Sequence, residues 1–270
     1  MTPLKFKLIS QLHFNYTNNV LYEGDTTDKF HSFEQAYIGQ RRKEDRVYDD
    51  ETVANLPNIS PNHPRADEWA LRKHSLEKLK DYLVKKESVD TILEVGCGNG
   101  WMTKALALQN KELCAIDINE TELLQAARLF PSDLISFVRA DIHTIPLETN
   151  SFDLIVLASS IQYFQDLKRL LDRLLTLLRS PGEIHIIDSP IYMRHEIPQA
   201  KKRTESYFTR NGQPDMTSFY FHHGYEEFIN LNWKFIYNPS SLSNLLKRKL
   251  GKRNSSPFPW ICIKKNGLDL

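Results

Sequence analysis

From residue 90 onward, short apolar runs alternate with helical segments, and this alternation restricts the fold more than any other feature of the chain. Leucines recur at three- and four-residue spacing over 167–178, which predicts one strongly amphipathic helix. Strands alternating with helices are typical of βαβ units, so we predict an α/β fold around a mostly parallel sheet. The predicted strands are 91–95, 113–116, 134–138, 152–157, 183–187, 233–237 and 260–264.

The segments that flank this pattern predict the domain organisation. Residues 1–88 hold few long apolar runs and one amphipathic stretch, 67–86, so we predict a helical cap that cannot bury a core alone. Residues 89–270 are then the core. Within it, 189–225 carries three prolines and seven aromatic residues and interrupts the alternation of strands and helices, which predicts an inserted lid segment over a site.

Charge, apolar runs and cysteine spacing exclude several classes of protein. Lys and Arg number 35 and Asp and Glu 34, a net charge of +1, so we expect no nucleic-acid partner. No apolar run approaches the roughly 18 residues of a membrane span, and the first residues are too polar for a signal peptide, which predicts a cytoplasmic protein. Cys97, Cys114 and Cys262 have no metal-ligand or disulfide spacing, so no metal is expected. The basic run 247–253 is interpreted as a solvated loop face.

The sequence TILEVGCGNGWMT runs from a strand into a helix and has glycines at 96, 98 and 100. Glycines at such a turn allow the backbone to approach a ligand closely. Dinucleotide binding is the first alternative, but the G-x-G-x-x-G pattern requires glycine at position 101, where this chain has Trp101. The spacing therefore disfavours NAD.

Three acidic residues accompany the first three core strands. Glu94 lies inside an apolar strand end, where a buried carboxylate needs donors or a cation, and a cationic ligand is one answer. Asp117 follows Gly96 by 21 residues, close to the spacing of about 20 at which an acid binds ribose hydroxyls. Asp141 follows the third strand, where it can accept a hydrogen bond from an exocyclic amine while Ile142 covers a flat base.

Four ordered motifs over about residues 90–188 resemble the class I methyltransferases that use S-adenosylmethionine, in particular the small-molecule group of methyltransferase type 11. They are ILEVGCGNG, AIDIN, ADIHTIPL with SFDLIVLASSIQYF, and LRSPGEIHIID. The resemblance implies a Rossmann-like, seven-stranded, mostly parallel sheet with helices on both faces and an antiparallel last strand.

The resemblance also implies which residues would bind S-adenosylmethionine. The glycines would contact the methionine part and the glutamate would hold the turn and the cationic end. Asp117 would bind the ribose hydroxyls, Asp141 the adenine amine, and the two isoleucines would pack against the adenine. Ser159 would lie near the sulfonium. The implied cofactor residues are Glu94, Gly96, Gly98, Gly100, Asp117, Ile118, Asp141, Ile142 and Ser159.

The predicted function is methyl transfer to oxygen, nitrogen or carbon of a small-molecule acceptor. Our first candidate for a general base is His223, and Tyr163 is the candidate for orienting the acceptor. Two alternatives stay open: a non-catalytic S-adenosylmethionine-binding sensor or scaffold, and a methyltransferase that acts on RNA or protein. Nothing in the sequence predicts the oligomeric state.

Overall fold

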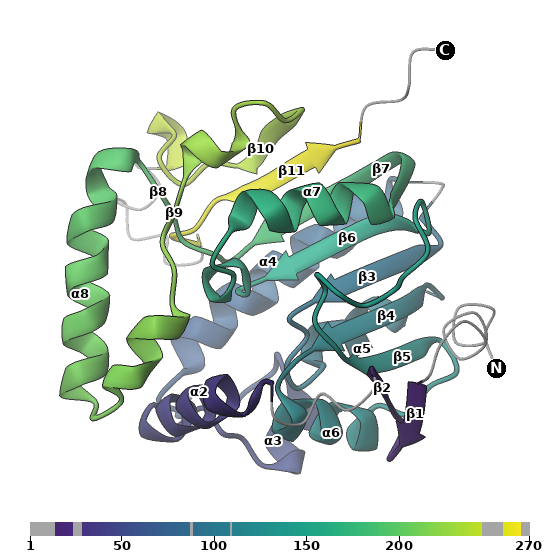
Figure 1. The fold of residues 1–270 in the computed structure, drawn as a ribbon, viewed down its shortest axis with the longest axis horizontal. Coiled ribbons are helices and arrows are strands. Elements are labelled where there is room, and N and C mark those ends of the chain that lie inside the picture. The colour runs from purple at the N-terminus through teal and green to yellow at the C-terminus, as the bar shows by residue number, and fades with distance from the viewer. Residues whose placement is uncertain (1–13, 24–28, 87–88, 109, 245–255, 266–270) are drawn as a thin grey trace.

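The computed structural model describes residues 14–23, 29–86, 89–108, 110–244 and 256–265. Its centre is a twisted sheet whose middle five strands run parallel, in the order β5-β4-β3-β6-β7 (Figure 1). The carboxyl ends of these strands therefore meet at one edge. Their bounds are Thr91–Val95 (β3), Glu112–Asp117 (β4), Ile135–Arg139 (β5), Phe152–Ala158 (β6) and Leu178–Ile187 (β7).

Two strands complete the sheet beyond β7. Trp260–Lys264 (β11) pairs antiparallel with β7, and Trp233–Tyr237 (β10) pairs antiparallel with β11. The predicted antiparallel last strand is thereby confirmed.

The predicted number of seven strands is wrong, because the described residues form a sheet of nine. The hairpin of Phe14–Thr17 (β1) and Val20–Glu23 (β2) joins the sheet, with β2 parallel to β5. Asn18 and Asn19 at its turn have φ of 52° and 63°, as tight hairpin turns require. A run of four residues is too short to read as a strand by periodicity, so the sequence predicts only helix for this segment.

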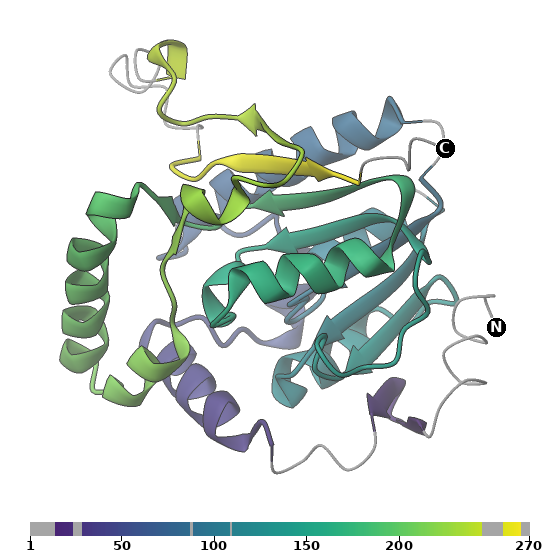
Figure 2. The same cartoon turned by 45° about the horizontal axis from the view of Figure 1, so that its top comes forward.

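Helices cover both faces of the sheet (Figures 1 and 2). Side chains of α4, α5 and α6 pack on one face, and the leucines of α7 pack on the other. Asp166 caps α7 by accepting from the Arg169 backbone N–H at 2.8 Å. The helices on these faces are Ala66–Val84 (α4), Trp101–Ala107 (α5), Glu120–Leu129 (α6) and Leu167–Leu177 (α7), with Asp50–Asn55 (α3) in contact with α6.

The segment after β7 leaves the sheet and stands beside it as α8, Ile197–Arg210 (Figure 2). Its Phe208 packs with Met216 and with Ala36 of α2, His31–Lys43, so the predicted lid meets the N-terminal segment. Shorter elements complete this part: Ile191–Tyr192 (β8), His223–Gly224 (β9), and the 3-10 turns Ile161–Tyr163 (η1), Arg194–Glu196 (η2), Pro214–Phe219 (η3) and Tyr225–Phe228 (η4).

No helix in the described ranges is both long and apolar enough to span a membrane. The basic run 247–253 lies outside the described residues, so its place on a loop face stays a prediction.

Candidate active site

The glycine turn between β3 and α5 has the backbone that its sequence predicts. Gly96, Gly98 and Gly100 have φ of 78°, 52° and 72°, a left-handed conformation that disfavours other residues. A Cβ on Gly96 would lie 2.5 Å from the Cβ of Ser160, and one on Gly100 would lie 2.8 Å from that of Ala126. Packing and backbone conformation together restrict these two positions to glycine.

Asp117 ends β4 and braces this turn. Its Oδ2 accepts a hydrogen bond from the Gly98 backbone N–H at 2.7 Å, and its Oδ1 accepts from the Asn119 N–H at 2.8 Å. Burial raises the pKa of Asp117 to about 6 despite these two donors. The carboxylate is thus held against the glycine turn, at the carboxyl edge of the sheet.

Glu94 lies one strand away and is 2% exposed. Its Oε2 accepts from the Thr103 hydroxyl of α5 at 2.6 Å. Burial raises the pKa of Glu94 to about 8, and the nearby charge of Asp117 adds to this rise. A cation bound beside Glu94 would favour its ionised form.

Asp141 lies farther along the same edge, after β5. It accepts from the His143 N–H at 2.9 Å and from the Lys29 ammonium at 3.0 Å. Burial opposes ionisation, but these donors hold the pKa of Asp141 below its usual value. Ile142 is buried in the core and Ile118 is half-buried, so the predicted contacts of both with adenine stay predictions.

A cavity of about 1070 Å³ lies between this edge of the sheet and helices α2, α4 and α8. Gly96, Gly98, Ser159 and Tyr163 line it, so the structure brings these four predicted residues together. The cavity adjoins the glycine turn but not Asp117 or the residues near 141. The cavity therefore offers space beside the glycine turn, where the methionine end of the predicted cofactor would lie.

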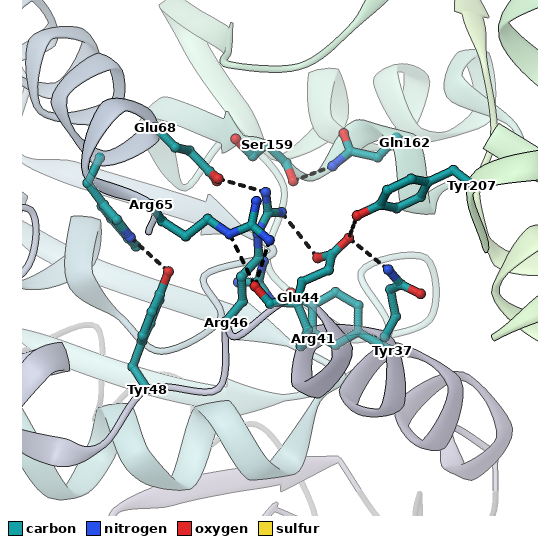
Figure 3. Close-up of polar contacts among 12 residues, drawn as sticks. Tyr37, Arg41, Glu44, Arg46, Tyr48, Arg65, Glu68, Ser159, Gln162 and Tyr207 are labelled. Atoms are coloured by element: carbon teal, nitrogen blue, oxygen red, sulfur yellow. Dashed lines mark hydrogen bonds and ion pairs between the residues drawn. The ribbon is translucent and has the colours of Figure 1, made fainter. Parts of the chain in front are cut away.

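Ser159 and Tyr163 form part of the cavity floor. The Ser159 hydroxyl donates to the Asp188 carbonyl at 2.9 Å. The Ser159 carbonyl accepts from Gln162 Nε2 at 2.6 Å (Figure 3). Tyr163 packs edge-on against Tyr37 of α2, with ring centroids 5.4 Å apart. Burial raises the pKa of Tyr163, so its hydroxyl stays protonated and able to donate.

Comparison with known proteins agrees with this geometry. Residues 93–186 match the family model described as "Methyltransferase domain". The chain carries a class I S-adenosylmethionine-dependent methyltransferase domain. An uncharacterized methyltransferase of Mycobacterium tuberculosis is 30% identical over 96 residues, 36% of this chain and 49% of that protein. The malonyl-[acyl-carrier protein] O-methyltransferase of Acetivibrio thermocellus is 27% identical over 161 residues, 56% of each chain. The chain thus spans about half the length of the curated relatives that it matches.

Solved structures share the fold of the methyltransferase domain and of much of the chain around it. A complex of the plantazolicin methyltransferase with a triazolic analogue and S-adenosylhomocysteine has a TM-score of 0.53 at 17% identity, covering 87% of this chain and 95% of that one. The geranyl diphosphate C-methyltransferase of Streptomyces coelicolor has a TM-score of 0.54 at 14% identity, covering 81% and 85%.

The structure does not support His223 as the base of the methyltransferase domain. The ring is 3% exposed and does not line the cavity. Its Nε2 lies 3.0 Å from the Ile161 carbonyl, and its Nδ1 lies 3.2 Å from Glu227 Oε1. The pairing of His223 with Ile191 in the short β8–β9 ladder holds the ring inside the fold. Both nitrogens therefore have partners that do not line the cavity.

A network of charged residues from the N-terminal segment lines the cavity. Figure 3 shows its polar contacts. Arg46 pairs with Glu68 of α4 at 2.6 Å and with Glu44 at 3.3 Å. Arg41 lies 3.6 Å from Glu122, and its Nε is buried without a hydrogen-bond partner among the described residues. The run 41–46 could be read from sequence as ion pairing or as carboxylate binding, and nothing in it predicts that it faces the cavity.

A second buried cluster lies on the opposite side of the domain, between α4, β7 and β11. Ligand atoms of Glu183, His185 and Cys262 lie within 4.8 Å of one another. Most of these atoms already take part in hydrogen bonds within the protein. Tyr82 donates to Glu183 at 2.7 Å, and Trp260 donates to His185 Nδ1 at 2.8 Å. Hydrogen bonds within the cluster therefore connect α4 to β7 and β11.

Proposed function

We propose that this protein transfers the methyl group of S-adenosylmethionine to oxygen, nitrogen or carbon of a small-molecule acceptor. The observation that carries this proposal is the left-handed glycine turn that Asp117 braces at the mouth of a large cavity. Support comes from the family match and from solved neighbours that hold S-adenosylhomocysteine, the product of the methyl donor.

The residues at the turn fit such a cofactor. A Cβ at 96 would clash with that of Ser160, so only glycine lets the turn pack this closely against the segment after β6. The buried Nε of Arg41 and Oε1 of Gln162, both on the cavity wall, have no partners among the described residues and can serve a polar ligand. In this proposal Glu94 and the glycines hold the methionine end, Asp117 the ribose and Asp141 the adenine. When bound, the cofactor supplies a methyl group on a sulfonium that a nucleophile can displace.

The chain's own contribution to this reaction is positioning and the exclusion of water. Helices α2 and α8 line the cavity and meet in the cluster of Ala36, Phe208 and Met216. Holding two reactants in line can supply several kcal/mol of the barrier without a catalytic side chain. Tyr163, which stays protonated, is suited to donate to the acceptor. We therefore interpret 1–88 as a cap and 189–225 as a lid over the core 89–270.

Relatives and neighbours differ widely in acceptor. Their names include a malonyl-[acyl-carrier protein] O-methyltransferase, a demethylmenaquinone methyltransferase, a plantazolicin methyltransferase and a geranyl diphosphate C-methyltransferase. We favour a small molecule because the acceptor space lies in a cavity between the sheet edge and helices α2, α4 and α8. Three buried free cysteines fit a reducing compartment, which supports a cytoplasmic location.

Two measurements test the proposal. In calorimetry we expect S-adenosylmethionine and S-adenosylhomocysteine to bind and NAD to bind at least tenfold more weakly. We also expect labelled methyl groups to enter the small-molecule fraction of a cell extract when the protein is added. Tighter binding of NAD would overturn the cofactor assignment. Cofactor binding without transfer to any fraction would favour the sensor instead.

A further inference from the structure

Asp188 follows β7 at the carboxyl edge of the sheet and lines the cavity. Its φ of 52° lies in the left-handed region, as does the φ of 54° at Ser159, which follows the neighbouring strand. The Ser159 N–H donates to the Ile187 carbonyl at 3.0 Å and the Ser159 hydroxyl to that of Asp188 at 2.9 Å. Non-glycine residues in this conformation are strained, and such strain concentrates at functional sites.

Only one of the two carboxylate oxygens of Asp188 accepts hydrogen bonds from the described residues. Its Oδ1 accepts from the hydroxyls of Ser75 at 2.7 Å and Ser256 at 3.3 Å. Its Oδ2 is buried and has no hydrogen-bond partner among the described residues. A buried acceptor without a donor is costly, which points to a donor supplied by a ligand. Four other polar atoms of residues that line the cavity are also buried without a hydrogen-bond partner among the described residues. They are the acceptors Gln40 Oε1 and Gln162 Oε1 and the donors Arg41 Nε and Arg46 Nε.

The surroundings of Asp188 suit a proton acceptor. Arg72 and His74 of α4 act electrostatically on Asp188 and lower its pKa, while Ser75 and Ser256 contribute hydroxyls from α4 and from the segment before β11. Burial outweighs these groups and raises the pKa of Asp188 above its usual value. A carboxylate with a raised pKa takes a proton more readily near neutral pH.

We propose that Asp188 contacts the nucleophile of the acceptor and takes its proton, which narrows the acceptor to a hydroxyl or an amine. This inference rests on the proposed function. As the new bond forms between the oxygen or nitrogen and the methyl carbon, the carbon–sulfur bond breaks and its electron pair returns to sulfur. The proton of the acceptor passes to Asp188 and then to solvent.

Sinefungin tests this without a known acceptor, because an amine-bearing carbon replaces its methylated sulfur. The protonated amine stands where the transferred methyl group would be, next to the nucleophile. We expect wild-type protein to prefer sinefungin over S-adenosylhomocysteine, and Asp188→Asn to reduce that preference at least about tenfold, the size of a charge-assisted hydrogen bond. Affinity for S-adenosylhomocysteine should stay unchanged in the variant. Asp172→Asn, an exposed change on α7, is the matched control and should alter neither affinity.

Because Asp188 anchors two serines, the unfolding midpoint of each variant is measured as well. The wild-type protein gives a second readout that needs no variant: its preference for sinefungin should fall as pH is lowered and Asp188 becomes protonated. A preference that Asp188→Asn leaves intact, or one that does not change with pH, overturns the role of Asp188. Failure of wild-type protein to bind S-adenosylhomocysteine at all overturns the proposed function itself.

Discussion

The Tyr207 hydroxyl of α8 donates a hydrogen bond to Glu44 Oε1 at the end of α2, a contact across 163 positions of sequence. Gln40 Nε2 donates to the same oxygen at 2.7 Å. Glu44 is buried, and the bond from Tyr207 is itself partly buried. Through the bond from Tyr207, Glu44 connects the proposed lid to the proposed cap.

Tyr207→Phe should loosen α8. The change removes one hydrogen bond to a charged group, which contributes about 1.5–3 kcal/mol, and the backbone amides of 197–210 should exchange at least tenfold faster. Hydrogen exchange measures this, with Tyr16→Phe in the distant β1–β2 hairpin as the control. We further expect S-adenosylhomocysteine to slow exchange in wild-type α8. Equal exchange with and without that ligand would argue against a lid.

Asp117→Asn should weaken binding of S-adenosylhomocysteine at least tenfold. The amide keeps the size of the side chain but offers only one good acceptor, so it cannot serve the Gly98 N–H and ligand hydroxyls as a carboxylate does. Calorimetry compares this variant with Asp133→Asn, an exposed aspartate before β5. Unchanged affinity in Asp117→Asn would contradict its place in the cofactor site.

Glu94 should make the ligand-free protein less stable as pH rises. Its pKa is about 8 in the folded protein against 4.5 for the ordinary side chain, so the folded state binds more protons between these values. The free energy of unfolding therefore falls from pH 4.5 to about 8, by about 1.4 kcal/mol per unit of pKa difference at most. Glu94→Gln should flatten this part of the profile in denaturant titrations. A profile unaltered by Glu94→Gln would mean that Glu94 does not titrate there.

Gly100→Ala should destabilise the fold far more than Gly212→Ala. Both glycines have positive φ, 72° and 68°, so each alanine incurs about 1–2 kcal/mol of backbone strain. At 100 the new Cβ would also lie 2.8 Å from that of Ala126, whereas nothing lies within 4 Å at 212. Thermal unfolding compares the two variants. Similar midpoints would show that the turn shifts to accept the methyl group.

Local patterns predict much of this fold. Strands 91–95, 233–237 and 260–264 have the predicted bounds, because apolar β-branched and aromatic runs between turns define them. The glycines at 96, 98 and 100 likewise predict the turn between β3 and α5. The bond between Asp117 and Gly98 follows from strand order, since adjacent parallel strands bring their ends together.

The rest of the site depends on contacts between distant segments. Nothing near 207 in the sequence indicates that its partner is Glu44, and the partners of Asp188 lie 113 and 68 positions away. The sequence LRSPGEIHIID does place Asp188 at a strand end, which is a signal that could have identified it. The burial of His223 beside the β8–β9 ladder is a tertiary effect that the sequence does not predict, so its role as a base stays a prediction that the structure does not support.

The hairpin of β1 and β2 also covers an edge of the sheet that could otherwise pair with another chain. Strand β5 is buried along its whole length, and β2 occupies the hydrogen-bonding side that β4 leaves open. Without the hairpin, β5 would present an apolar row of unpaired N–H and C=O groups, a template for pairing with another chain. The hairpin therefore protects β5 from pairing with another chain. We expect a shortened protein that begins near residue 30 to self-associate through β5.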